Sequence, residues 1–173
     1  MDISLDKLRN SLIEQLSVFR KIAIQCDSTV HHVKPHGALY NLAAKDRVVA
    51  ECVVSATIIV YNKCYVYAPY QSMLACVAHE KKLEVIYEAF ADRNYNDDLG
   101  LVSRKKGNAL LTDPAKVADQ VLMMTKEKQV VTVNNNKLPI EADTFCVHGD
   151  NPQALLLLKN LVLQLNKNDI NVA

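Results

Sequence analysis

Helix-like and strand-like stretches alternate along this chain of 173 residues. After Ser4, apolar residues recur every three or four positions from Leu5 to Ala23, which is typical of a helix with a polar cap. Further helices are predicted over residues 39–55, 72–82 and 151–165 and from Pro114 onward, and short strands over residues 30–33, 64–68, 84–90, 129–133, 137–140 and 144–147. Helices that alternate with short apolar strands predict an α/β fold with a parallel sheet.

The connections between these elements are also informative. Residues 92–107 form a long polar loop, and long loops in compact domains are usually functional or mobile. Residues 134–136 are three asparagines, which predict a turn because asparagine tolerates a positive φ. Residues 56–61 are rich in β-branched side chains and fit either a helix or a strand. The sequence has no internal repeat and no linker, so residues 1–173 are predicted to form a single domain.

Composition and charge exclude several classes of protein. Half of the residues are hydrophobic, as in globular proteins. The 20 basic and 19 acidic side chains leave a net charge of +1, which argues against a nucleic-acid partner. No signal peptide is recognisable, and the most apolar stretch, residues 48–61, is too short to span a bilayer. The five cysteines are scattered and odd in number, so we expect reduced thiols in a cytoplasmic protein without a membrane partner.

The first of three polar clusters covers residues 32–41 and follows a predicted strand. Pro35 stiffens the backbone and Gly37 allows it to turn, so Lys34 and His36 are expected to face the same loop. A lysine suits a carboxylate or a phosphate, and a histidine is the usual acid or base at neutral pH. The alternative is a polar turn with a capping histidine.

The second cluster, residues 90–93, follows another predicted strand. Adjacent residues at a strand end point to opposite sides, so Asp92 and Arg93 need not pair with each other. Arg93 suits a two-pronged contact with a carboxylate, and the alternative is a structural ion pair. Arg104 and Tyr95 lie in the long loop that follows, where the alternative for each is a solvated side chain.

The third cluster covers residues 142–152, in which His148 and Asp150 end a strand and Asn151 and Pro152 begin a helix. A histidine and an aspartate can act as base and orienting group or as metal ligands, but two residues are too few for a metal site. The four glycines form no phosphate-cradling loop, and neither a Gly-Lys-Ser/Thr nor a Gly-x-Ser-x-Gly motif is present. No nucleotide or metal site therefore follows from the motifs themselves.

Together, the three clusters and the segment Leu101-Val102-Ser103-Arg104 resemble the LamB/YcsF family, in the family's order and spacing, from about Leu5 to Val172. The resemblance implies a partial (β/α) barrel, similar to TIM barrels and to glycoside hydrolases and deacetylases. It implies a hydrolase that opens a cyclic amide, 5-oxoproline (pyroglutamate), to L-glutamate with ATP, accompanied by magnesium, as cofactor. It also implies the 5-oxoprolinase subunits B and C as partners.

The polar residues that match the family are Lys34, His36, Asp92, Arg93, Arg104, His148 and Asp150. The resemblance implies that the small-molecule substrate or a phosphorylated intermediate is bound by Lys34, Arg93 and Arg104. Either Asp92 or Asp150 is the expected base for water. His36 and His148 are the expected proton donors or oxyanion-stabilising groups. Because the three clusters end strands, we expect these side chains to meet at the carboxyl edge of one parallel sheet.

The sequence departs from the family pattern at its front, because an acidic first strand and two histidine-containing motifs are missing. Residues 1–173 are therefore expected to match the C-terminal two-thirds of the barrel. A barrel that is cut open exposes strand edges and apolar faces, which predicts self-association and no activity for the chain alone. One alternative is a non-catalytic truncated paralogue or fragment that only binds the partner subunits. Another, by fold analogy, is a metal-dependent deacetylase-like hydrolase.

Overall fold

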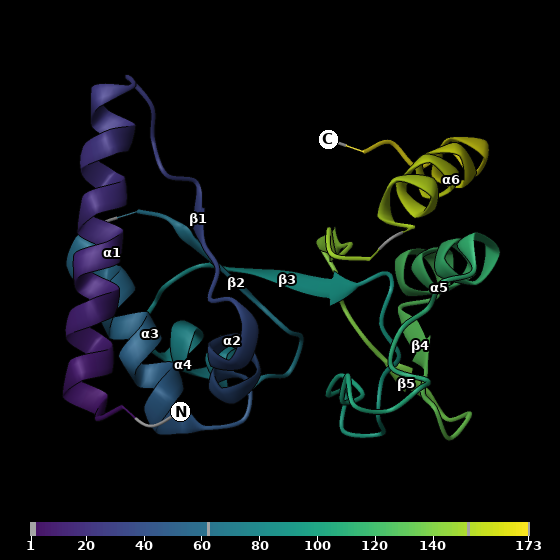
Figure 1. Cartoon of the computed structure of the whole chain (residues 1–173), viewed down its shortest axis with the longest axis horizontal. Coiled ribbons are helices and arrows are strands. Elements are labelled where there is room, and N and C mark those ends of the chain that lie inside the picture. Colours follow the sequence, from purple (N-terminus) through teal and green to yellow (C-terminus); the bar gives the residue numbers. More distant parts are fainter. Residues whose placement is uncertain (1–2, 62, 152, 173) are drawn as a thin grey trace. The chain divides into compact units, whose positions relative to one another are not determined.

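The computed structural model describes residues 3–61, 63–151 and 153–172, and it has the predicted α/β fold (Figure 1). Helices alternate with strands, and the main strands pair in parallel. The chain divides into two compact units, the first ending at Tyr87 and the second beginning at Glu88. No helix of the described residues is long and apolar enough to cross a membrane. The single-domain organisation stays a prediction.

The first unit is a short parallel sheet with helices packed on it. Its elements are α1 (Leu5–Gln25), β1 (His32–Val33), α2 (Gly37–Ala43), α3 (Arg47–Val60), β2 (Tyr65–Ala68), α4 (Met73–Glu80) and the first half of β3 (Val85–Phe90). β2 pairs with β1 and with β3, both in parallel. Alternate residues of β2, Val66 and Ala68, are fully buried and share a core with α3 and α4. This alternation is that of a strand with one face covered.

The predicted first helix is confirmed, with its cap. The Ser4 hydroxyl accepts a hydrogen bond from the Lys7 N–H, which satisfies one of the unpaired donors of the first turn. Leu8 is buried, and Leu12 and Leu16 pack against the same core. Phe19, which the spacing also places on the apolar side, is 59% exposed, so the buried stripe of this helix is shorter than predicted.

The single helix predicted over residues 39–55 is wrong, because two helices stand in its place. α2 ends at Ala43, and α3 begins after Asp46, whose carboxylate accepts from the N–H groups of Val48 and Val49. An aspartate at this position favours a new helix start over continuation. α3 then runs to Val60, so the ambiguous residues 56–61 are mostly helical.

The second unit packs two helices beside a pair of parallel strands. Its elements are the second half of β3, α5 (Pro114–Lys126), β4 (Gln129–Val131), β5 (Lys137–Pro139), β6 (Thr144–Cys146) and α6 (Ala154–Lys167). Residues Glu88–Phe90 of β3 pair in parallel with β6. α5 and α6 lie side by side (Figure 1) and contact each other, and the core of this unit includes Val117 and Val121 of α5 and Leu157 and Leu161 of α6.

Two local predictions in this unit are confirmed and one is wrong. β4 and β5 form an antiparallel hairpin, and Asn135 in its turn has a φ of 62°. Asp113 accepts a hydrogen bond from the Ala115 N–H and caps α5, which begins at Pro114 as predicted. The prediction that the last helix begins at Asn151 is wrong: α6 begins at Ala154 with Gln153 as its cap residue, and the Asn151 side chain accepts a hydrogen bond from the Gln153 N–H ahead of the helix. Pro152 lies outside the described residues.

Candidate functional site

Two of the sequence-predicted residues, Asp92 and His148, meet at the carboxyl ends of β3 and β6. Each of them lies two residues beyond the end of its strand. The parallel pairing continues past both strands, since the Ala91 N–H donates to the Cys146 carbonyl at 3.0 Å. Residues 56 positions apart in the sequence are thereby brought into contact. The strand ends deliver these side chains to one place, as expected for parallel strands.

The Asp92 carboxylate binds His148 twice. Its Oδ1 accepts from the His148 ring Nδ1 at 2.8 Å, and its Oδ2 accepts from the His148 backbone N–H at 3.0 Å. Asp92 is fully buried, whereas the His148 side chain is 19% exposed. Because a carboxylate can only accept, Nδ1 carries a ring proton, and in the neutral form of the ring Nε2 is the acceptor nitrogen. The ring stacks on Phe90, with centroids 5.4 Å apart.

Opposing effects set the charge state of Asp92. Burial raises the pKa of its carboxyl, but the hydrogen bonds and charge of His148 outweigh burial and hold that pKa below its ordinary value. The carboxylate therefore stays ionised at neutral pH. An ionised aspartate that orients a histidine is a recurring arrangement at proton-transfer sites.

Arg93 is buried and binds the protein's own backbone. Its Nε donates to the Ala109 carbonyl at 3.2 Å and its Nη2 donates to the Val102 carbonyl at 2.5 Å. Burial, with the nearby charge of Arg104, lowers its pKa from the ordinary value. Asp92 and Arg93 thus have separate partners, as the strand-end geometry predicts. A contact between Arg93 and a substrate carboxylate stays a prediction.

Tyr95 is buried, so the solvated alternative for this residue is wrong. Its hydroxyl oxygen accepts a hydrogen bond from the Phe90 N–H at 2.7 Å, and burial raises its pKa. This contact attaches the start of the long loop to the last residue of β3. The single tyrosine in a polar stretch gave no periodic signal for this role.

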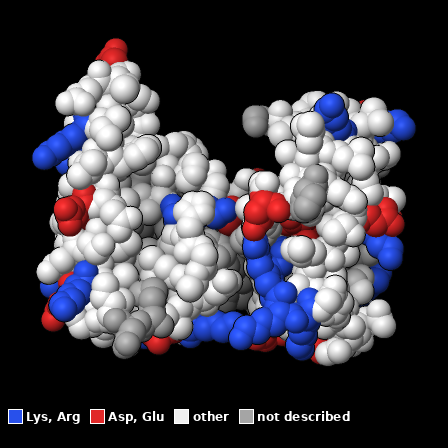
Figure 2. Space-filling view, viewed as in Figure 1, with Lys and Arg blue, Asp and Glu red and all other residues white. Residues whose placement is uncertain are grey.

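Asp150 and Arg104 form an ion pair on the surface of the same unit. The Arg104 Nη1 lies 2.7 Å from Asp150 Oδ2, and the two side chains are 50% and 66% exposed. The hydrogen bond and charge of Arg104 lower the pKa of Asp150. In the view of Figure 2, acidic and basic side chains lie next to each other on this unit. The aspartate that orients His148 is therefore Asp92, and Asp150 has a different partner.

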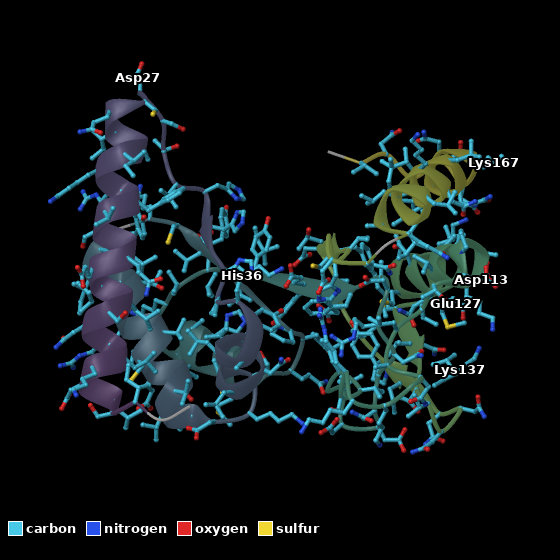
Figure 3. The ribbon with its side chains drawn as sticks, in the orientation of Figure 1. Asp27, His36, Asp113, Glu127, Lys137 and Lys167 are labelled. Atoms are coloured by element: carbon cyan, nitrogen blue, oxygen red, sulfur yellow. The ribbon has the colours of Figure 1, made fainter. Side chains whose placement is uncertain are left out.

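Lys34 and His36 belong to the first unit. The Lys34 Nζ lies 5.8 Å from the centre of the Tyr40 ring, and Gly37 has a φ of 60°, the turn that the sequence predicts. His36 is exposed and stands at the start of α2 (Figure 3), but its side chain makes no capping hydrogen bond. His36 therefore occupies the capping position that the alternative predicts, but its ring does not cap the helix. The convergence of these two residues with Asp92 and His148 stays a prediction.

The structure also shows whether a metal ion could bind and identifies one further residue, Gln120, beside the Asp92–His148 pair. Among residues 3–61, 63–151 and 153–172, no group of three or more His, Cys, Asp or Glu side chains could hold a metal ion. Gln120 of α5 contacts the backbone around Asp92, and the sequence pattern did not single it out. Its only signal was a polar residue three positions after the buried Val117 of an amphipathic helix.

The fold and the paired aspartate and histidine define an α/β protein with a polar site at the ends of parallel strands. Residues 1–173 match the profile of the LamB/YcsF family, and the chain belongs to this family. It is 42% identical over 143 residues to the 5-oxoprolinase A subunit of Halalkalibacterium halodurans, covering 83% of this chain and 56% of that protein. It is 38% identical over 172 residues to the 5-oxoprolinase A subunit of Staphylococcus aureus, covering 99% of this chain and 69% of that protein.

A solved structure agrees with this assignment. The crystal structure of a lactam utilization protein from Thermus thermophilus superposes with a TM-score of 0.90 at 26% identity, covering 99% of this chain and 68% of that chain. The chain thus spans between 56% and 69% of the length of these three proteins. Parallel strands alternating with helices over this part of the fold are consistent with the predicted partial barrel.

Proposed function

We propose that this chain forms part of a 5-oxoprolinase of the type that opens 5-oxoproline to L-glutamate with consumption of ATP, and that it corresponds to the A subunit, which acts with the B and C subunits. Family membership and the names of its relatives support the proposal. The single observation that carries it is the buried Asp92 carboxylate, which fixes His148 with its Nε2 as the acceptor nitrogen. Opening a lactam with water needs a base of this kind.

In the proposed reaction, His148 exchanges protons with water and with the leaving nitrogen. Nε2 takes a proton from a water molecule as the water oxygen bonds to the lactam carbonyl carbon. When the carbon–nitrogen bond breaks, the same proton passes from Nε2 to the nitrogen, which becomes the amine of glutamate. Asp92 stabilises the charged ring between these steps. Because Asp92 is fully buried, we assign contact with water to His148 and orientation to Asp92.

The two arginines of the second unit that match the family both have partners within the protein. The Arg93 guanidinium donates to backbone carbonyls, and Arg104 is paired with Asp150. The sequence also has no glycine-rich phosphate loop. A lactam carbonyl is a poor electrophile, and activating it is the chemistry that ATP supplies. The involvement of ATP in this reaction is supported by the family resemblance.

The test is ATP-dependent release of glutamate in the presence of the B and C subunits. The chain is assayed as it is and after extension by the part of the S. aureus relative that it does not match. In the active assembly, His148→Gln should lower kcat by roughly 10²–10⁴-fold, the usual contribution of a general base. His79→Gln, on α4 of the first unit, is the matched control and should leave kcat unchanged.

Two outcomes would contradict the proposal. One is the absence of ATP-dependent glutamate release from the extended chain with both partner subunits. The other is equal turnover by the His148→Gln and unaltered enzymes. Binding of the B and C subunits without glutamate release would point instead to the non-catalytic fragment that the sequence leaves open.

A further inference from the structure

Gln120 contacts three backbone carbonyl groups of the turn that carries Asp92. Its Nε2 lies 3.1 Å from the Phe90 carbonyl oxygen, 3.1 Å from that of Ala91 and 3.0 Å from that of Arg93. One carboxamide nitrogen, with two hydrogens, therefore serves three acceptors. The glutamine is only partly exposed and comes from the middle of α5, so a regular helix holds its backbone in place.

These contacts complete the fixing of the turn. On the N–H side, Phe90 donates to the Tyr95 hydroxyl oxygen and Ala91 donates to the Cys146 carbonyl. On the carbonyl side, three oxygens point toward one place on α5, where their partial charges repel unless a donor lies among them. Gln120 supplies that donor. The residues on both sides of Asp92 are thereby held in place. The Asp92 carbonyl itself accepts a hydrogen bond from the Leu111 N–H.

We propose that Gln120 is a positioning residue, which holds the 90–93 turn so that both oxygens of the buried Asp92 carboxylate accept hydrogen bonds from His148. Both of these hydrogen bonds depend on where the Asp92 backbone lies. A small shift lengthens at least one of them and loosens the histidine ring. The importance of Gln120 for catalysis rests on the proposed function, but its effect on the Asp92–His148 pair exists without turnover.

The experiment measures the hydrogen bond of the His148 ring directly. Gln120→Leu removes the donor at similar volume, and Gln120→Glu keeps the shape but places an acceptor among the three carbonyls. Gln164→Leu is the matched control, since Gln164 is also a partly buried helical glutamine of this unit and its side chain makes no hydrogen bond in the described part of the chain. The full chain is labelled with ¹⁵N-histidine, and the signal that disappears in His148→Gln identifies His148.

In the unaltered chain and in Gln164→Leu, the His148 Nδ1 proton should exchange slowly with solvent. In Gln120→Leu and Gln120→Glu its exchange should be faster by roughly tenfold or more, the equivalent of one lost hydrogen bond, and faster than the accompanying fall in the free energy of unfolding, measured by urea denaturation, accounts for. Unchanged exchange in either folded Gln120 variant would overturn the proposal. So would faster exchange that merely follows a fall in global stability.

Turnover provides a separate readout. In the active assembly, Gln120→Leu should lower kcat by roughly tenfold with KM unchanged, because the glutamine acts on the base and not on substrate binding. If the unaltered assembly releases no glutamate, the proposed function fails while the exchange measurement still decides the role of Gln120. If kcat is unchanged although the ring proton exchanges faster, the positioning has no catalytic consequence and the proposal is wrong.

Discussion

At the residue scale, the contrast between Asp92 and Asp150 explains which aspartate works with His148. Both belong to polar clusters at strand ends, but the sequence suggests only Asp150, two residues after His148, as the orienting partner of the histidine. Asp92 is fully buried and accepts from two groups of His148, whereas Asp150 is 66% exposed and binds Arg104. A buried contact orients a ring far better than an exposed ion pair, which gains little in water.

Replacing Asp92 by asparagine should move the ring proton of His148. Asparagine has one acceptor oxygen, and if this oxygen keeps the His148 backbone N–H, its amide group faces Nδ1. Nδ1 must then accept, and the proton moves to Nε2, so the base is lost. The ¹⁵N shifts of His148 report the tautomer. A ring that stays protonated at Nδ1 in Asp92→Asn would contradict this explanation.

The same aspartate should make the stability of the chain depend on pH in acid. The pKa of Asp92 is lowered in the folded state, below the ordinary value of 3.8 that it takes in the unfolded chain. Its stabilising contribution is therefore complete above about pH 4 and is lost as the pH falls through the folded-state pKa. The difference in unfolding free energy between the unaltered chain and Asp92→Asn should shrink below pH 4. A difference that grows on acidification would contradict the prediction.

Replacing Arg93 by lysine should distinguish a structural role, in which the guanidinium binds backbone carbonyls, from a role in binding a substrate carboxylate. A lysine ammonium cannot reach both the Ala109 and the Val102 carbonyls in the way that the planar guanidinium does. We expect the free energy of unfolding to fall by about 1–3 kcal/mol, as for a buried acceptor left without its donor. Urea denaturation measures this, with Lys116→Arg on the exposed side of α5 as control. Unchanged stability together with lost substrate affinity would identify Arg93 as the carboxylate clamp.

At the scale of elements, local signals predicted most of the secondary structure and failed where tertiary contacts decide. The caps of α1 and α5 and the hairpin turn at Asn135 follow from residue types over a few positions. The break between α2 and α3 also has a local signal, the Asp46 cap, but the helical pattern of the sequence runs across the break and hides that signal. There the Ala44 carbonyl accepts from the Met73 N–H, which comes from another element.

The contacts within the candidate site likewise could not be predicted from local sequence patterns. That Asp92 and His148 end strands is readable from the sequence, but their contact requires β3 to lie beside β6. The hairpin and α5 lie between these strands in the chain, so no local pattern indicates the pairing. The three contacts of Gln120 likewise depend on how α5 packs on the turn. Residue types predicted the candidates, and only the pairing of the strands selected among them.

The boundary between α2 and α3 can be tested by removing its cap. Asp46→Ala takes away the acceptor of the Val48 and Val49 N–H groups and should cost about 0.5–2 kcal/mol of unfolding free energy. Asp119→Ala, at an exposed position within α5, is the control and should change stability little. Urea denaturation of both variants checks this. Equal stability of Asp46→Ala and the unaltered chain would show that packing alone ends α2.

At the scale of the whole molecule, the surface of α6 is unusually apolar. The helix buries Leu157, Leu161 and Leu165 against its own unit. It also carries five exposed apolar side chains, namely Leu155, Leu156, Leu158, Val162 and Leu163. In Figure 2, uncharged atoms dominate the surface over this helix, with few basic side chains among them. An apolar stretch of this kind is costly to leave in water.

We therefore expect the chain by itself to self-associate, and α6 to contribute to the contact. Leu155 and Leu156 are 67% and 56% exposed, and burying a leucine fully is worth about 1.5–3 kcal/mol. The double variant Leu155→Lys, Leu156→Lys should shift the molar mass measured by light scattering toward that of a monomer. Asn166→Lys adds a charge at an exposed position of the same helix without removing apolar surface, and should leave the mass unchanged. A monomeric unaltered chain at every concentration measured, or a double variant with undiminished mass, would contradict the prediction.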